Sequence, residues 1–248
     1  MPERSRSVAV IPARGGSKRI LRKNLRDFLG VPLVVRTIRT VLDSNLFERV
    51  VVSTDDDEIA ELAKAAGAEV PFLRPAELAT DEAPTAPVIV HAIEQVESIF
   101  EMQIEFVCVV YPAAVLLSPD DLVQAAELLT STEIDAVIST IEFPSAIERA
   151  LRVNEAGFIE MEWPQHRLTR SQDLPTHFYD AGQFYFTLSE YWSDQVSAKP
   201  DSEQRVRPYP MQRWQAVDID TEDDWTFAEK LFAIHVAERL KMDGHPSS

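Results

Sequence analysis

The 248 residues include 24 Lys and Arg against 41 Asp and Glu, a formal net charge of −17, and 45% of them are hydrophobic. A chain of this length and hydrophobicity can bury the core of one α/β domain, so we expect a single domain over residues 1–248. The negative charge argues against nucleic acid or an anionic membrane as the partner, because proteins that bind phosphate backbones usually carry a basic surface.

The single cysteine, Cys108, lies in the apolar run FVCVVY and has no second cysteine with which to form a disulfide. This usage is typical of a reducing cytoplasm. The apolar run before Arg14 is too short for a secretory signal, and no run approaches the roughly 20 apolar residues that span a bilayer. The sequence therefore predicts a cytoplasmic protein without a membrane anchor.

The chain begins with an apolar run at residues 8–12, which predicts a buried strand, and a basic loop with two adjacent glycines follows. We expect Gly15 and Gly16 to adopt positive φ angles, so that backbone N–H groups converge on an anion. The cations around the two glycines are Arg14, Lys18, Arg19, Arg22 and Lys23. The loop matches neither the P-loop nor the dinucleotide-binding motif, so an anion cradle and a solvated basic turn both stay open.

Apolar runs then alternate with amphipathic stretches, which is the pattern of a βαβ series. The expected helices cover residues 32–44, 56–66, 84–100 and 119–130. The expected strands cover residues 49–54, 70–72, 105–111 and 136–143. The alternation predicts an α/β fold with a mostly parallel, twisted sheet flanked by helices.

Residues 144–180 break this pattern with three prolines and with mixed aromatic and basic residues. They predict an excursion from the sheet, which either packs on a partner subunit or forms a plain surface loop. Strand character returns over residues 181–187 and 215–220, and residues 221–240 predict a closing amphipathic helix.

Asp218 and Asp220 flank Ile219 at the end of the last expected strand. The two-residue period of a strand would place both carboxylates on one face and Ile219 in the core. Such a pair suits Mg²⁺, which takes one or two protein carboxylates and completes its shell with water and substrate phosphates. The alternative is a solvent-facing Asp218 and an Asp220 that only caps the following helix.

Read together, the segments resemble the CMP-N-acylneuraminate synthetase family, the cytidylyltransferases that activate nine-carbon sialic-acid-like sugars. The matching stretches are IPARGGSKRILRKN at residues 11–24, the segment at residues 53–85 and DIDTEDDW at residues 218–225. A longer motif, RLTRSQDLPTHFYDAGQFY at residues 167–185, is similar to the pseudaminic acid branch of that family.

The resemblance implies a Rossmann-like nucleotidyltransferase fold and a transferase that couples CTP to a nonulosonic acid with release of pyrophosphate. Pseudaminic acid is the implied sugar; neuraminate, legionaminate and KDO are alternatives, as is a catalytically idle nucleotide-binding homologue. The family also implies Mg²⁺ as cofactor and a homodimer in which the segment at residues 144–180 reaches the site of the neighbouring subunit.

Position within the motifs implies a role for individual residues. Catalysis is expected to depend on Arg14, Lys18, Lys23 and Asp220, and Mg²⁺ on Asp218 and Asp220. The residues expected to contact the nucleotide are Ala13, Arg14, Gly15, Gly16, Asn24 and Arg74. The residues expected to contact the sugar are Arg170, Gln172, Asp180, Gln183 and Phe184.

Two positions depart from the family pattern. Leu21 stands where the family usually has proline, and Ala113 and Ala114 replace a turn that usually carries a threonine. The second departure removes a hydroxyl group near the expected position of the sugar.

Overall fold

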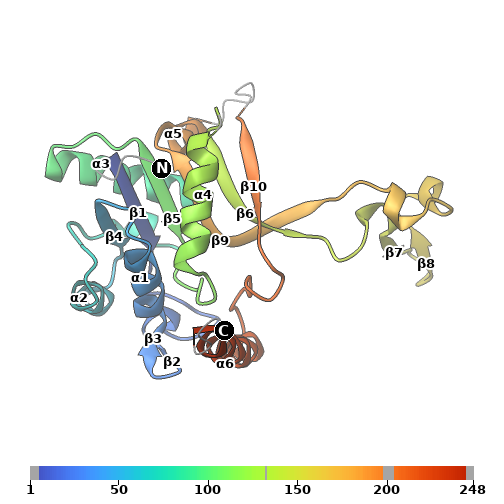
Figure 1. The fold of residues 1–248 in the computed structure, drawn as a ribbon, viewed down its shortest axis with the longest axis horizontal. Coiled ribbons are helices and arrows are strands. Elements are labelled where there is room, and N and C mark those ends of the chain that lie inside the picture. Colours follow the sequence, from blue (N-terminus) through green and yellow to red (C-terminus); the bar gives the residue numbers. More distant parts are fainter. Residues whose placement is uncertain (1–5, 132, 198–203, 244–248) are drawn as a thin grey trace, which may run out of the picture.

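A computed structural model describes residues 6–131, 133–197 and 204–243 of the chain. Its centre is a six-stranded sheet with the strand order β10-β6-β9-β5-β1-β4 (Figure 1). Neighbouring strands are parallel except β9, which runs antiparallel to both β5 and β6. The predicted α/β fold with a mostly parallel sheet is confirmed.

The strands of this sheet are β1 (Ser7–Pro12), β4 (Arg49–Ser53), β5 (Phe106–Val110), β6 (Ala136–Glu142), β9 (Phe178–Leu188) and β10 (Val206–Pro210). The helices are α1 (Leu33–Asp43), α2 (Asp57–Ala65), α3 (Thr85–Phe100), α4 (Pro119–Ser131), α5 (Glu190–Ser197) and α6 (Glu222–Asp243). Two short hairpins lie outside the sheet, β2 (Asp27–Phe28) with β3 (Val31–Pro32) and β7 (Leu151–Val153) with β8 (Ile159–Met161).

Helices cover both faces of the sheet. Residues of α1, α2 and α4 pack with Ala9 and Ile11 of β1 on one face, and residues of α3 and α5 pack with Val8 and Val10 on the other. Both faces of β1 are therefore buried, which explains why its sequence is continuously apolar. None of the helices that the structure describes is both long and apolar enough to cross a bilayer.

Two strand predictions are wrong, and one strand of the six-stranded sheet is missed. Residues 70–72 form no strand, because the chain touches the sheet there only through a single bridge between Val51 and Glu69. Residues 215–220 also lie outside any strand. The sixth strand is β10, whose sequence VRPYP holds two prolines. Proline is tolerated there because β10 is an edge strand with only one hydrogen-bonded neighbour.

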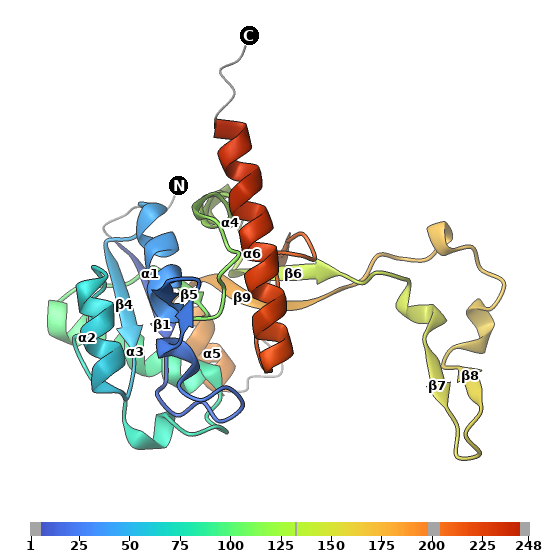
Figure 2. The same ribbon diagram turned by 90° about the horizontal axis from the view of Figure 1, so that it is seen from below.

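The predicted excursion is an arm that leaves the body of the molecule between β6 and β9 and carries the hairpin β7-β8 (Figure 2). The arm is shorter than predicted and ends at His177, because Phe178, Tyr179 and Asp180 already pair with β6. Several of its apolar side chains are exposed: Leu151, Val153, Phe158, Ile159 and Leu168.

The basic N-terminal loop is held against the start of α6. Arg26 forms an ion pair with Glu222, and its guanidinium carbon lies 4.3 Å from the ring centroid of Trp225. The ring of Phe28 also packs against Trp225, with 5.4 Å between centroids. These contacts bring Asp218 and Asp220, which directly precede α6, next to the basic loop.

Candidate active site

A cleft of about 930 Å³ opens where β1 and β5 end. Loops that follow parallel strands collect at this edge, which is where open α/β sheets bind ligands. Its walls come from the basic loop, the connection before α3, the turn after β5, strand β9 and the segment before α6. The polar and charged residues that line the cleft include Arg14, Lys18, Arg19, Lys23, Asn24, Arg74, Asp81, Thr85, Tyr111, Asp180, Gln183, Tyr185, Asp218 and Asp220.

The two glycines of the basic loop do not form the predicted N–H cradle. Neither has a positive φ angle, and the left-handed residue of the loop is Arg22, with φ 51°. Gly15 is required for space instead, because a Cβ there would lie 2.5 Å from a carboxylate oxygen of Asp56. Its N–H donates to Asp55 at 2.9 Å. The loop therefore meets the cleft with cationic side chains rather than with converging backbone N–H groups.

Four of the five predicted cations line the cleft, and Arg22 does not. Arg22 turns toward α2, where it pairs with Asp56 and Glu58. Leu21, the residue that departs from the family pattern, is 81% exposed beside it. The structure contains nothing that explains a leucine rather than a proline at that position.

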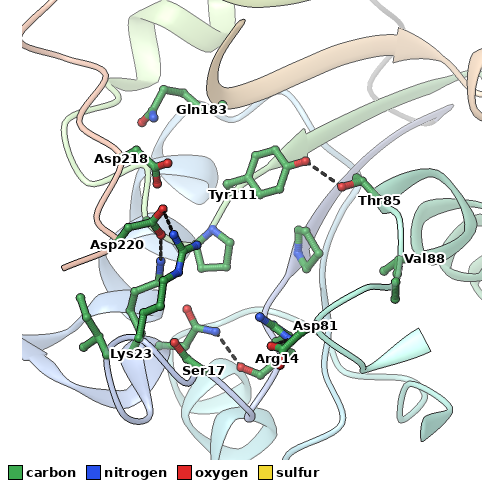
Figure 3. A pocket seen from close by; sticks show the side chains of 18 of the residues that line it. Arg14, Ser17, Lys23, Asp81, Thr85, Val88, Tyr111, Gln183, Asp218 and Asp220 are labelled. Carbon is green, nitrogen blue, oxygen red and sulfur yellow. Dashed lines mark hydrogen bonds and ion pairs between the residues drawn. The ribbon is translucent and has the colours of Figure 1, made fainter. Parts of the chain in front are cut away.

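Lys23 connects the basic loop to the predicted metal ligands. Its ammonium group donates to the carbonyl oxygen of Ile219 at 2.7 Å and lies 3.7 Å from a carboxylate oxygen of Asp220. Arg19 also pairs with Asp220. Burial lowers the pKa of Lys23, although the nearby carboxylates oppose that shift. Figure 3 shows Lys23, Asp218 and Asp220 gathered on one side of the pocket.

The two carboxylates lie on an irregular segment, but their predicted relation to the core is confirmed. Ile219 is fully buried, and Asp218 and Asp220 both line the cleft. Partial burial and the neighbouring Asp220 carboxylate raise the pKa of Asp218. In the part of the chain that the structure describes, no three acidic, histidine or cysteine side chains form a ready metal site. The protein thus offers two carboxylates, and a bound cation would need further ligands.

On the other side of the pocket, the carboxylate of Asp81 holds two cations of the basic loop. Arg14 and Lys18 both form ion pairs with it. Hydrogen bonds from Lys18 and Arg14 lower the pKa of Asp81, so the carboxyl group is ionised near neutral pH. Asp81 therefore pairs with the two cations that the resemblance assigns to the triphosphate.

Asn24 and Arg74 are buried in the wall of the cleft, where hydrogen bonds fix both side chains. The amide of Asn24 donates to the carbonyl oxygen of Arg14 at 2.8 Å. Arg74 donates to the hydroxyl and the carbonyl oxygen of Ser53 at the end of β4. Burial, with Arg14 nearby, lowers the pKa of Arg74 to about 10 despite the opposing charge of Asp55. An anionic ligand would offset the burial of this guanidinium group.

A bulge in β9 turns part of the strand toward the cleft. Gly182 has φ +60°, and the pairing register between β6 and β9 shifts at this point. The N–H groups of Gln183 and Phe184 both donate to the hydroxyl of Ser139. Bulges commonly redirect side chains next to active sites. Asp180 and Gln183, both predicted to contact the sugar, line the cleft as a result.

Phe184 was predicted to contact the sugar, but its side chain points away from the cleft. It is fully buried against Tyr209, with 5.5 Å between ring centroids, and does not line the cleft. Tyr185 lines the cleft in its place and donates a hydrogen bond to Asp180. The alternation of a strand could have identified Tyr185, because it shares a face with Gln183.

Two further hydroxyl groups lie at the same end of the cleft: that of Thr85, which ends the matching segment at residues 53–85, and that of Tyr111, which was not predicted as a site residue. The hydroxyl oxygens of Thr85 and Tyr111 are 2.9 Å apart (Figure 3). They stand near the turn in which Ala113 and Ala114 replace the threonine-bearing family sequence. This end of the cleft therefore keeps hydroxyl groups, although the threonine of the family turn is absent.

Other predicted residues do not reach the cleft of their own chain. Arg170 and Gln172 lie on the arm, where Arg170 pairs with Asp173, and neither lines the cleft. The side chain of Ala13 is buried in the core. Gly15 and Gly16 also stay outside the lining.

Comparison with known proteins gives a consistent result. The family model described as "Cytidylyltransferase" matches residues 8–212. A pseudaminic acid cytidylyltransferase of Campylobacter jejuni is 40% identical over 231 residues, which cover 93% of this chain and 97% of that protein. A CMP-N,N'-diacetyllegionaminic acid synthase of Legionella pneumophila is 30% identical, again over 93% and 97% of the two chains.

The fold comparison agrees with the sequence comparison. A solved structure of CMP:2-keto-3-deoxy-manno-octonic acid synthetase complexed with CTP superposes with a TM-score of 0.69 over 94% of this chain and all of that chain. At 17% identity this likeness shows the fold alone. The family match covers most of the chain, and the resemblance noted in the sequence is confirmed. The chain belongs to the cytidylyltransferase family and is a nucleotidyltransferase.

Proposed function

We propose that this chain couples CTP to pseudaminic acid, giving the CMP-sugar and pyrophosphate. The observation that carries the proposal is the 40% identity with a pseudaminic acid cytidylyltransferase over nearly the whole of both chains. The DAGQFY motif at residues 180–185 supports it, because Asp180, Gln183 and Tyr185 all face the cleft. The sugar in the name of the Legionella relative is N-acylated, and we include N-acyl groups in the proposed substrate class.

In the proposed reaction the anomeric hydroxyl oxygen of the sugar forms a bond to the α-phosphorus of CTP. The bond between that phosphorus and the bridging oxygen breaks, pyrophosphate leaves, and the hydroxyl proton passes to water. Positioning and charge neutralisation dominate such phosphoryl chemistry. Arg14 and Lys18 would bind the negative charge of the departing pyrophosphate, and Lys23 would hold the α-phosphate beside Asp220.

We also propose Mg²⁺ as the cofactor, bound by Asp218 and Asp220. The two residues fit a hard cation, because the raised pKa of Asp218 reflects partial burial and repulsion by Asp220, and a divalent ion offsets both. When bound, the ion would polarise the α-phosphate as a Lewis acid. Lys23 and Arg19 keep the Asp220 carboxylate in place.

We further infer that the chain acts as a homodimer in which the arm completes the cleft of the partner. Two observations support this proposal. The arm exposes Leu151, Val153 and Phe158, which a partner subunit would cover. Arg170 and Gln172, which the resemblance assigns to the sugar, lie on the arm and outside the cleft of their own chain.

The substrate assignment is tested by measuring pyrophosphate release with CTP, Mg²⁺ and a panel of sugar acids: pseudaminic, legionaminic and neuraminic acid derivatives and KDO. We expect the largest kcat/KM with pseudaminic acid. A larger kcat/KM with any other member of the panel would overturn the assignment of the sugar while keeping the cytidylyltransferase reaction. Replacing CTP by ATP, GTP or UTP is the control for the nucleotide.

A further inference from the structure

Asp121, in the first turn of α4, is a buried carboxylate that lies outside the cleft and has no role in the reaction proposed above. At the start of the helix, the N–H and the hydroxyl of Ser118 donate to its Oδ2 at 2.9 Å and 2.7 Å. The hydroxyl of Ser118 in turn accepts from the N–H of Asp121 at 3.2 Å. This reciprocal pair has the form of a capping box, which stabilises the first turn of a helix. A capping box needs no partner from elsewhere in the fold.

The Asp121 carboxylate nevertheless accepts hydrogen bonds from two side chains that lie far along the chain. Tyr209 of β10 donates its hydroxyl to Oδ1 at 3.0 Å, and the side-chain amide of Gln215 donates to Oδ2 at 3.3 Å. The orientation of that amide is defined, because its oxygen accepts from the N–H of Gln212 at 3.0 Å. Asp121 therefore links α4 to the segment between β10 and α6, which carries Asp218 and Asp220.

The segment between β10 and α6 contains no helix or strand, so its course depends on individual contacts. At its start the N–H of Met211 donates to β6 at 2.8 Å. Near its end Lys23 donates to the carbonyl oxygen of Ile219, whose side chain is fully buried. Between these two points the segment is held by the hydrogen bond from Gln215 to Asp121.

This hydrogen bond matters most for Asp218. Asp220 is held directly, because Arg19 and Lys23 both form ion pairs with it. In the part of the chain that the structure describes, no cation forms an ion pair with Asp218, although it lies beside Asp220 at the pocket (Figure 3). The position of Asp218 therefore follows the backbone, and Gln215 lies three residues before it.

We propose that Asp121 is a positioning residue of the metal site, which acts through Gln215 on Asp218. The proposal rests on the proposed function, in which Asp218 and Asp220 bind Mg²⁺. This ion demands near-octahedral geometry and tolerates little error in the position of a ligand. A bond that fixes the Asp218 backbone from outside the cleft keeps the two carboxylates in place despite their mutual repulsion. Loss of such supporting hydrogen bonds commonly weakens metal binding about 10- to 100-fold.

The test breaks the link at Gln215. Gln215→Glu keeps the oxygen that accepts from the N–H of Gln212, but it replaces the donor to Asp121 by a carboxylate oxygen, which repels it. We expect the dissociation constant of Mn²⁺, measured by electron paramagnetic resonance on the protein without nucleotide, to rise about tenfold. Mn²⁺ is a suitable probe because it takes the same oxygen ligands as Mg²⁺.

Kinetics with Mg²⁺ give a second readout of the same variant. The Mg²⁺ concentration for half-maximal pyrophosphate release should rise by a similar factor in Gln215→Glu. At saturating Mg²⁺ its kcat should change less than about twofold, because the bound ion draws both carboxylates back into place.

Gln212→Glu is the matched control, because it makes the same change at an exposed position of the same segment. It also separates the link from the effect of charge. An added carboxylate near the site attracts a divalent cation, so charge alone predicts tighter Mn²⁺ binding in both variants. The lost link predicts weaker binding in Gln215→Glu only.

A second pair of variants approaches the link from α4. Asp121→Ala removes the acceptor and should weaken Mn²⁺ binding about as much as Gln215→Glu. Ser118→Ala removes the capping hydroxyl from the same carboxylate but leaves the bond from Gln215 in place. It should lower the melting temperature and keep the dissociation constant of Mn²⁺. Circular dichroism at the assay temperature verifies that each variant is folded.

The outcomes distinguish this proposal from the proposed function. If Gln215→Glu and Asp121→Ala bind Mn²⁺ as the wild type does, Asp121 only caps α4, and the proposed function stands. A kcat that falls equally at every Mg²⁺ concentration, with unchanged Mn²⁺ affinity, leads to the same conclusion.

Failure of the proposed function gives different results. If the wild-type protein releases no pyrophosphate with any sugar acid, the proposed function fails, whereas weaker Mn²⁺ binding by Gln215→Glu still supports the link to the carboxylates. If the wild-type protein binds no Mn²⁺, the proposed metal site fails, and the role of Asp121 fails with it.

Discussion

The ammonium group of Lys23 donates a hydrogen bond to the carbonyl oxygen of Ile219, so the basic loop near the N-terminus is fastened to the segment between Asp218 and Asp220. The two parts are far apart in the sequence, and the packing of Phe28 against Trp225 holds them together. The residues proposed to bind the triphosphate therefore lie beside the two carboxylates proposed to bind Mg²⁺.

Lys23→Ala should lower kcat about 10²–10³-fold, by analogy with removal of one preorganised contact to a transition state. The ammonium group is the one that we place beside the α-phosphate. Steady-state pyrophosphate release measures the effect. Lys64→Ala, which removes an exposed lysine of α2, is the matched control and should keep full activity. Turnover near the wild-type rate in a folded Lys23→Ala protein would remove the role proposed for this residue.

Asp220→Asn should also lower kcat about 10²–10³-fold and should raise the Mg²⁺ concentration needed for half-maximal activity, because it removes one of the two carboxylates proposed to bind the ion. Titration of Mg²⁺ at saturating CTP and sugar measures both effects. Asp223→Asn, on the exposed first turn of α6, is the control. A variant with an unchanged Mg²⁺ dependence would show that Asp220 is not a ligand.

Asp81→Asn should lower the KM for CTP and leave kcat unchanged. The Asp81 carboxylate pairs with Arg14 and Lys18, and under the proposed function it would compete with the triphosphate for both cations. Exposed ion pairs of this kind contribute up to about 1 kcal/mol, so the expected change is about fivefold or less. Glu82→Gln, the neighbouring substitution, should have no effect. A higher KM in Asp81→Asn would instead show that Asp81 helps to bind the nucleotide.

Subunit mixing tests the proposed dimer. Gln172→Ala removes an arm residue, and Lys23→Ala disables the cleft, so each variant alone should be nearly inactive. If the two are unfolded and refolded together at equal amounts, about one quarter of the clefts receive an intact arm and an intact Lys23, since half of the dimers are mixed and each has one complete site. Recovery of about that fraction of activity is expected, and no recovery would contradict an arm that acts in trans.

An acidic pH limit should accompany the metal site. The pKa of Asp218 is raised by burial and by Asp220, so protonation competes with the cation at a higher pH than for an ordinary aspartate. Activity at limiting Mg²⁺ should therefore fall as the pH drops through this raised pKa, and saturating Mg²⁺ should move the midpoint to lower pH. A midpoint that does not respond to Mg²⁺ would separate the titration from metal binding.

Much of this fold is predictable from the sequence, because the periodicity of α1, α2, α3 and α4 and the apolar runs of β1, β4 and β5 directly reflect burial. β10 is harder to predict, since Pro208 and Pro210 are tolerated only at a sheet edge and edge position is a property of the whole sheet. Residues 215–220 have the pattern of a strand in the sequence but do not form one. Ile219 is buried by packing near α6 and not by strand pairing.

The residues of the candidate site can also be predicted from the sequence only in part. The motifs place Arg14, Lys23, Asp218 and Asp220 correctly at the cleft, because chemistry constrains their residue types. Phe184 is misassigned because neighbouring residues of a strand point to opposite faces, and Gln183 already faces the cleft. The hydroxyl groups of Thr85 and Tyr111 come from separate elements that only the folded sheet brings together, so their pairing cannot be predicted from the sequence.

The most direct test of the account is to follow the α-phosphate itself. CTP labelled with ³²P at the α position is incubated with the protein, Mg²⁺ and pseudaminic acid, and the products are separated. We expect the label to move into a CMP-sugar in step with an equal amount of pyrophosphate, and Lys23→Ala to slow the transfer about 10²–10³-fold. A protein that binds CTP but leaves the label in CTP with every sugar acid supplied would contradict it.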